Sequence, residues 1–255
     1  MPWYRHLLWP FAVLYGIGVW IRNRLFDSGI LPKKEFDIPI ICVGNLEAGG
    51  TGKSPVVLHM IKLLRENSMN VAMWSRGYGR STSGFLLVSD NDSAKKVGDE
   101  PLQAKLRFPS VEVAVCENRV EGIERLTSSK NKPDVILMDD GFQHRYVKAG
   151  LNILVTRSEL PFWKNHLIPV GTLREAKSGR NRADALITIG AQKSNPAFEG
   201  AEFWAHPIAE ELIQFSGAQS EVSMIKSAFL VSGIGNADRF EQTIGDQFKV
   251  LDHIK

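Results

Sequence analysis

The sequence has 255 residues, of which 44% are hydrophobic and 23% are charged, with a formal net charge of +3. This composition excludes an intrinsically disordered chain, and the length suits one large domain or two small ones. The small net charge gives no reason to expect nucleic acid as a partner, and no protein partner is implied.

The first predicted element is an apolar helix near the amino terminus. Residues 7–21 carry no charge, and Arg22 and Arg24 follow them. The run is shorter than the roughly 20 residues that cross a bilayer, and no signal-peptide cleavage site follows it. Pro10 suits the first turn of such a helix. We expect residues 1–26 to be embedded in one face of a membrane, with a helix packed in the protein's own core as the alternative.

Short apolar runs and helical patterns alternate in the next part of the chain. The predicted strands are 38–45, 71–77, 111–117, 134–140 and 151–157, and the predicted helices are 55–67 and 119–129. Alternation of this kind predicts an α/β fold with a mostly parallel sheet, in which ligands bind beyond the carboxyl ends of the strands. The two cysteines, Cys42 and Cys116, lie inside strand-like runs, so we expect buried, reduced thiols.

The sequence suggests two domains after the helix. Residues 27–157 form the predicted nucleotide-binding domain, and 158–255 form a second, smaller α/β lobe. The strand candidates of this lobe are 183–190, 201–206 and 228–236. Residues 158–182 form a long loop without a clear period, which is typical of a functional loop or a linker.

The stretch VGNLEAGGTGKSP, residues 43–55, follows a predicted strand and precedes a predicted helix. A phosphate-binding loop normally has a glycine at the position of Glu47. The remaining loop residues still allow backbone N–H groups and a helix amino end to receive phosphates. The predicted nucleotide-binding residues are Gly49, Gly50, Thr51, Gly52, Lys53 and Ser54. The alternative is a glycine-rich turn with a chance Lys-Ser pair.

A second nucleotide motif is predicted in VILMDDGFQHR, residues 135–145. An apolar strand ending in Asp139 and Asp140 supplies carboxylates that bind Mg²⁺, and Ser54 is the third predicted metal residue. His144 lies in the following loop, where it could contact a phosphate group of the nucleotide. The alternative is that its ring makes a structural hydrogen bond.

Three further stretches are polar. NKPD at 131–134 matches a guanine-recognition pattern, but it precedes a strand instead of following one, so we expect only a turn. SRGYGR (75–80) closes a strand, and KVGDEP (96–101) is expected to be a loop. Phosphate transfer to an alcohol uses a carboxylate that accepts the hydroxyl proton, and Asp99 and Glu100 are candidates by residue type alone.

These stretches together closely resemble the tetraacyldisaccharide 4'-kinase (lipid A 4'-kinase) family. The matching segments are VGNLEAGGTGKSP, SRGYGR, GDEP, DDGFQHR, IPVGTLRE and the Asp-His pair at 252–253. The resemblance implies a two-lobed P-loop kinase that uses ATP and Mg²⁺. It would phosphorylate the 4'-hydroxyl of tetraacyldisaccharide 1-phosphate at the cytoplasmic face of the bacterial inner membrane, where the amino-terminal helix would hold the enzyme beside its lipid substrate.

The resemblance also implies roles for individual residues. Lys53 and Asp139 would act in catalysis, Asp99 would be the general base, and His253 would orient that base. The residues implied in contacts with phosphate or substrate are His144, Arg174 and, as a weaker candidate, Arg119. The alternative for Arg119 is a surface arginine at a helix end.

One feature departs from the family pattern. Members of the family continue well beyond the Asp-His pair, whereas this sequence stops two residues after His253. We therefore expect the chain to bind nucleotide but to turn over slowly. The competing interpretations are a membrane-attached P-loop ATPase or GTPase switch, a kinase of another small alcohol, and a binding module without catalysis.

Overall fold

The structure is a computed structural model that describes residues 7–192, 198–206, 208, 227–232, 237–245 and 248–254. The chain divides into two compact units, Met1–Ala205 and His206–Lys255, which are described separately. The division falls later than the boundary expected after residue 157. The reason is that the strands predicted at 183–190 and 201–206 add to the sheet of the first unit.

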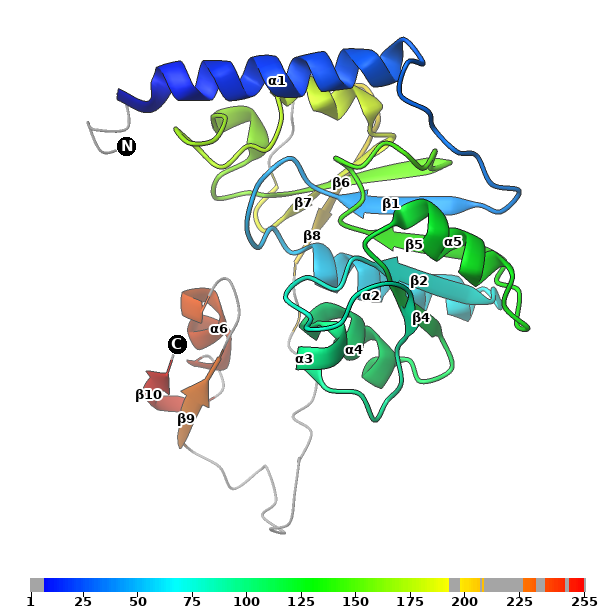
Figure 1. Ribbon diagram of the computed structural model, residues 1–255. Coiled ribbons are helices and arrows are strands. Elements are labelled where there is room, and N and C mark those ends of the chain that lie inside the picture. Colours follow the sequence, from blue (N-terminus) through cyan, green and yellow to red (C-terminus); the bar gives the residue numbers. More distant parts are fainter. Residues whose placement is uncertain are drawn as a thin grey trace. The chain divides into compact units, whose positions relative to one another are not determined.

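The first unit is built on an eight-stranded sheet with the order β3-β4-β2-β5-β1-β6-β7-β8 (Figure 1). The strands are β1 Ile40–Gly44, β2 Val71–Ser75, β3 Leu86–Leu87, β4 Glu112–Val115, β5 Val135–Asp139, β6 Leu151–Arg157, β7 Ala185–Ile189 and β8 Ala201–Ala205. All neighbouring strands are parallel except β3 and β4. The predicted α/β class with a mostly parallel sheet is confirmed.

The sheet is buried on both faces, as its apolar strands predict. Every residue of β1, β2 and β5 is buried. Alternate residues enter two cores: one is shared with α2 (Lys53–Glu66) and α4 (Asp99–Arg107), the other with α5 (Arg119–Thr127). Both cysteines are free and buried, as expected.

The sequence missed some of the local structure. Residues 96–101 were expected to form a loop, but the short helix α3 (Ala94–Val97) and α4 meet there, separated by Gly98 alone. Two 3₁₀ helices, η2 (Phe162–Lys164) and η3 (Lys177–Arg182), lie in the long loop after β6. These elements are short, so they carry no clear hydrophobic period.

Helix α1, Trp9–Asp27, runs along the outside of the first unit (Figure 1). Pro10 lies in its first turn, as predicted. Only Ala12 and Phe26 of this helix are buried, so the core-helix alternative is wrong for most of its length. Among the described residues, no helix combines the length and the apolar character that crossing a membrane requires.

The second unit contains a parallel pair of strands, β9 (Ser227–Val231) and β10 (Lys249–Ile254), and the helix α6 (Ala237–Gly245). The strand predicted at 228–236 is confirmed in part, because residues 233–236 lie outside the described residues.

Candidate active site

The phosphate-binding loop has the predicted context, between the end of β1 and the start of α2. Gly49 and Gly52 have φ angles of +103° and +89°, a region that L side chains rarely adopt. A Cβ atom on Gly44 would lie 2.5 Å from the Cβ of Phe142, so the end of β1 needs glycine to approach the loop after β5. The glycines therefore set both the shape of the loop and its distance from the second motif.

Hydrogen bonds hold this loop in place. The Asn45 amide donates to the Thr51 hydroxyl across the loop, at 2.8 Å. The main chain also pairs with the IPVGTLRE stretch: the Ala48 N–H donates to the Thr172 carbonyl, and the Arg174 N–H donates to the Leu46 carbonyl, both at 2.7 Å. The segment before Arg174 thus lies along the loop, and places Arg174 beside it.

Glu47, at the position where the usual pattern has glycine, has a fully buried side chain. The Thr156 hydroxyl on β6 donates to its Oε2 atom at 3.2 Å. Burial raises the pKa of the Glu47 carboxyl, against the opposing effects of Thr156 and Arg157. The substitution is accommodated because the side chain is enclosed by the protein interior.

Asp139 is the last residue of β5, and Asp140 follows it beside this loop. The Asp140 carboxylate lies 3.3 Å from the Lys53 ammonium and 2.9 Å from the Arg174 guanidinium. Burial alone would raise the pKa of Asp140, but Lys53 and Arg174 lower it below its ordinary value. Asp139 is buried, and within the described part of the chain no lysine or arginine forms an ion pair with it. Burial, followed by the charges of Glu100 and Asp140, raises the pKa of Asp139 to about 8.

The helix α4 also reaches the loop. The Ser54 hydroxyl donates to Glu100, the second residue of α4. Gly98 packs against the backbone of Gly77, where a Cβ would lie 3.2 Å from the Gly77 Cα. The SRGYGR and GDEP stretches are therefore adjacent. Asp99 is exposed at the start of α4, and the residue after it, Glu100, is the one that contacts Ser54.

Arg119 and His144 belong to a basic group beside Asp140. Arg119 is only 8% exposed, with its guanidinium 4.9 Å from the Trp74 ring centroid, so the surface-arginine alternative is wrong. Burial and then the Arg119 and Arg22 charges lower the pKa of His144 to about 4, so its ring is neutral at pH 7. Within the described residues the ring makes no hydrogen bond, so nothing supports the structural alternative.

His253 lies in the second unit. Its ring nitrogens contact the Ser232 hydroxyl at 2.7 Å and the Glu241 carboxylate at 3.0 Å. Because the two units are described separately, its pairing with Asp99 stays a prediction.

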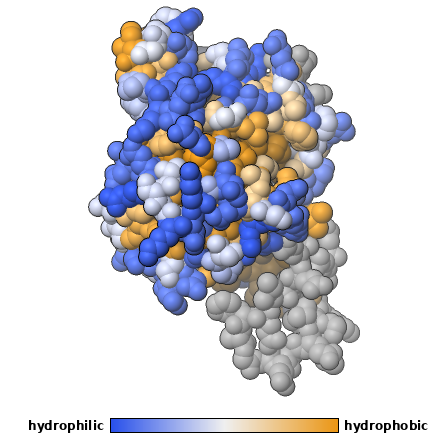
Figure 2. Space-filling view, turned by 90° about the vertical axis from the view of Figure 1, so that its right-hand side faces the viewer, coloured by the Kyte–Doolittle hydropathy of each residue, from blue (hydrophilic) through white to orange (hydrophobic). Residues whose placement is uncertain are grey.

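The opposite end of the sheet carries the NKPD stretch. The β1 arrow in Figure 1 points left, so the strands begin on the right, the side that faces the viewer in Figure 2. Hydrophilic residues surround a central hydrophobic area there. The Asn70 N–H donates to Asp134 at 2.7 Å, and the Asn70 side-chain amide donates to the carbonyls of Asn131 and Lys132. The stretch is a turn that leads into β5, as predicted.

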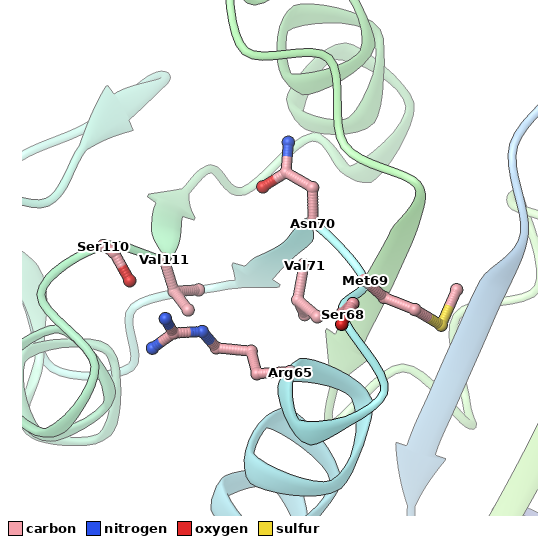
Figure 3. A pocket seen from close by; sticks show the side chains of 7 residues that line it. All are labelled: Arg65, Ser68, Met69, Asn70, Val71, Ser110 and Val111. Atoms are coloured by element: carbon pink, nitrogen blue, oxygen red, sulfur yellow. The ribbon is translucent and has the colours of Figure 1, made fainter.

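A cavity of about 330 Å³ lies at this same end (Figure 3). It is lined by residues from the end of α2 and the starts of β2 and β4: Arg65, Ser68, Met69, Asn70, Val71, Ser110 and Val111. Since the phosphate-binding loop follows the carboxyl end of β1, this cavity is not the nucleotide site.

Comparison with known proteins identifies the family. The family model described as tetraacyldisaccharide-1-P 4'-kinase matches residues 4–253. The chain belongs to the tetraacyldisaccharide-1-P 4'-kinase family. The curated tetraacyldisaccharide 4'-kinase of Flavobacterium psychrophilum is 46% identical over 222 residues, which are 87% of this chain and 63% of that protein. The curated tetraacyldisaccharide 4'-kinase of Bacteroides fragilis strain YCH46 is 51% identical over 181 residues, which are 71% of this chain and 48% of that protein.

A solved structure of this kinase family has the same fold. The crystal structure of LpxK from Aquifex aeolicus in complex with ATP matches with a TM-score of 0.82 and 32% identity. The match covers 98% of this chain and 81% of that one. The match thus spans 63% and 48% of the length of these two curated relatives, and 81% of the solved kinase chain.

Sequence reasoning missed several residues of this candidate site. Glu100 was a candidate only by type, and nothing in the sequence placed it on Ser54. Gln143 donates to the Asn45 carbonyl at 2.5 Å and to Glu175 at 3.2 Å. Gln143 and Glu175 lie in stretches that match the kinase family, DDGFQHR and IPVGTLRE, and this match was the one signal in the sequence that could have found them.

Proposed function

We propose that this chain is an ATP- and Mg²⁺-dependent kinase that phosphorylates the 4'-hydroxyl of tetraacyldisaccharide 1-phosphate. The observation that carries the proposal is the convergence of Lys53, Asp140 and Arg174 beside a glycine-rich loop at the carboxyl end of the sheet. The names of the relatives and the ATP complex of the solved kinase support the substrate and the nucleotide.

In the proposed site the phosphates of ATP lie on the loop. Its backbone N–H groups and the amino end of α2 supply positive potential, and Lys53 contacts the β- and γ-phosphates. The residues expected around the phosphates are Gly49, Gly50, Thr51, Gly52, Lys53 and Ser54. Arg174 and Arg119 carry further positive charge toward the transferred group.

The residues present fit a magnesium ion. Within the described residues, the buried Oδ1 atom of Asp139 accepts no hydrogen bond, which leaves it available as a ligand. Among those residues no group of three His, Cys, Asp or Glu side chains gathers, so the expected ligands are two carboxylates and a hydroxyl. Ser54, Asp139 and Asp140 would hold Mg²⁺, which neutralises charge on the β- and γ-phosphate oxygens.

The acceptor hydroxyl requires a base. Asp99 is exposed at the start of α4, and its neighbour Glu100 contacts the loop through Ser54. Asp99 accepts the proton of the 4'-hydroxyl as that oxygen bonds to the γ-phosphorus, and the bond from phosphorus to the β,γ-bridging oxygen breaks to release ADP.

The lipid acceptor gives α1 a role at the membrane. Large apolar side chains are exposed along this helix, including Phe11, Leu14, Ile17 and Trp20, and Leu7 is exposed just before it. Such a surface suits insertion into one face of a bilayer, with basic residues near the lipid phosphates. We place the enzyme at the cytoplasmic face of the bacterial inner membrane. Binding to anionic vesicles should weaken in Phe11→Ser/Leu14→Ser, and unchanged binding would contradict this role.

The proposal is tested by transfer of labelled γ-phosphate from ATP to tetraacyldisaccharide 1-phosphate in detergent micelles. We expect transfer by the chain and its loss in Lys53→Ala and Asp99→Asn. Because this chain is shorter than its relatives, a carboxyl-terminally extended form is assayed beside it. No transfer by either form, with ATP binding intact, would contradict the kinase. Preference for GTP over ATP would favour a nucleotide-dependent switch.

A further inference from the structure

Helix α1 has a second face that contacts the candidate active site. Most of the exposed side chains of α1 are apolar, whereas several of its polar side chains bond to the rest of the first unit. Two of them, Tyr15 and Asn23, contact residues more than 150 positions away in the sequence. The polar side chains of α1 that bond to the rest of the unit are called the inner face: Tyr15, Arg22, Asn23 and Asp27.

Two contacts of the inner face reach the IPVGTLRE segment. The Tyr15 hydroxyl donates to the Arg174 carbonyl at 2.7 Å, and the Asn23 amide donates to Glu175 at 3.2 Å. The Arg174 guanidinium in turn bonds to Asp140 at 2.9 Å. The helix therefore holds the main chain of the residue whose side chain enters the phosphate site.

Other contacts reach the loop after Asp140. The Arg22 guanidinium donates to the Gln143 carbonyl at 2.5 Å. Arg145 donates to the Asn23 carbonyl at 3.0 Å and pairs with Asp27. The loop that carries the predicted metal and phosphate residues is thus bonded to α1 on both sides of His144.

Glu175 joins the two segments. Glu175 is only 2% exposed. The Arg182 guanidinium donates to both of its carboxylate oxygens, at 2.8 and 2.9 Å, and the Gln143 side-chain amide donates to one of them at 3.2 Å. Buried charge-assisted bonds of this kind fix side-chain geometry. A displacement at Asn23 or Glu175 is therefore transmitted to Gln143 and Arg174.

We propose that Tyr15 and Asn23 are positioning residues for phosphate transfer, which hold Arg174 and the 140–145 loop in their working arrangement. The inference rests on the proposed kinase function. The helix that meets the lipid surface thereby also sets the geometry of the phosphate site, in addition to any role in binding the membrane.

The kinetic test uses Tyr15→Phe/Asn23→Leu, which removes the two hydrogen bonds at nearly constant side-chain size. The matched control is Tyr146→Phe, whose ring packs on Phe26 of α1 and whose hydroxyl makes no hydrogen bond within the described residues. We expect kcat of the double variant to fall about tenfold with little change in KM for ATP, since small displacements of positioned groups cost rate. The control should keep the kcat of the parent chain.

A double-mutant cycle separates positioning from a general loss of structure. If the inner face acts through Arg174, the double variant should lower kcat less than about twofold in an Arg174→Ala background. Unchanged kcat in the parent background would overturn the proposal. An equal loss of kcat in both backgrounds would also overturn it.

Amide hydrogen exchange gives a readout that needs no turnover. The double variant should exchange faster than the parent chain in segments 141–146 and 172–176, and Tyr146→Phe should not. If neither this chain nor its carboxyl-terminally extended form transferred phosphate, the proposed kinase would fail, and this exchange result would still decide whether Tyr15 and Asn23 hold the two segments in place. Unchanged exchange in both segments would overturn it.

Discussion

The two ends of the eight-stranded sheet carry similar polar residues but differ in what those residues contact. At the carboxyl end, Lys53 and Arg174 both meet Asp140, which is separated from them by more than 30 residues in sequence. At the amino end, Asp134 accepts a hydrogen bond from the Asn70 main-chain N–H, and the Asn70 side-chain amide donates to main-chain carbonyls of the NKPD turn, so these polar groups satisfy the main chain. A nucleotide-like pattern thus indicates a ligand site only where the strand direction brings charged groups together around a loop.

The largest expected effect is the loss of a lysine at the carboxyl end. Lys53→Ala should lower phosphate transfer about 1000-fold, because the γ-phosphate loses a preorganised positive charge. Lys132→Ala removes a lysine of the NKPD turn and is the matched control. Its transfer rate should equal that of the parent chain. A comparable loss in Lys132→Ala would remove the distinction between the two ends.

Carboxylates at the two ends of β5 should behave in opposite ways. Asp139→Asn should lower the rate of phosphate transfer about 100-fold and raise the Mg²⁺ concentration that gives half-maximal transfer, because a metal ligand loses its charge. Asp134→Asn should leave transfer unchanged but lower the free energy of unfolding by about 1 kcal/mol, because the Asn70 N–H loses a charged acceptor. Metal titrations and urea unfolding of both variants check this. A stability loss confined to Asp139→Asn would contradict it.

His144 at the carboxyl end should make its own contribution to the pH dependence of stability, opposite in sign to that of Asp139, whose pKa is raised to about 8. The pKa of His144 in the folded protein is about 4, below its ordinary value of 6.5. The folded state therefore binds fewer protons than the unfolded state, and the stability present above pH 6.5 is lost as pH falls toward 4. His144→Gln should remove this loss, so that the unfolding free energy of the variant falls less than that of the parent chain as pH is lowered from 6.5 to 4. His59→Gln, on the exposed side of α2, should leave it unchanged, and the reverse result would contradict the assignment.

The smallest effect is expected at the unusual loop residue. Because burial raises the pKa of the Glu47 carboxyl, a neutral side chain of the same shape fits its environment. Glu47→Gln should change ATP affinity less than about twofold, whereas Glu47→Ala should lower stability by about 1–3 kcal/mol through loss of buried contacts. Isothermal titration and thermal unfolding measure both. A large loss of ATP affinity in Glu47→Gln would show that the charge matters.

The central strands and both nucleotide motifs were predictable from the sequence, whereas their side-chain contacts were not. β1 and β5 are continuous apolar runs, and such runs specify buried parallel strands. The bond between Ser54 and Glu100 depends on tertiary packing between segments 46 residues apart. The burial of Arg119 over Trp74 likewise reflects tertiary packing, which no local pattern encodes. Leu63 lies in the helix predicted at 55–67 but is 44% exposed, because α2 faces the sheet through Val56, Val57 and Ile61.

The most direct test of the account is amide hydrogen exchange of this chain with and without ATP and Mg²⁺. If the carboxyl end of the sheet binds the nucleotide, exchange should slow in segments 44–54 and 139–145. It should stay unchanged in segments 68–71 and 130–135 at the amino end. Protection at the amino end alone would contradict the account and revive the guanine-recognition interpretation of the NKPD stretch.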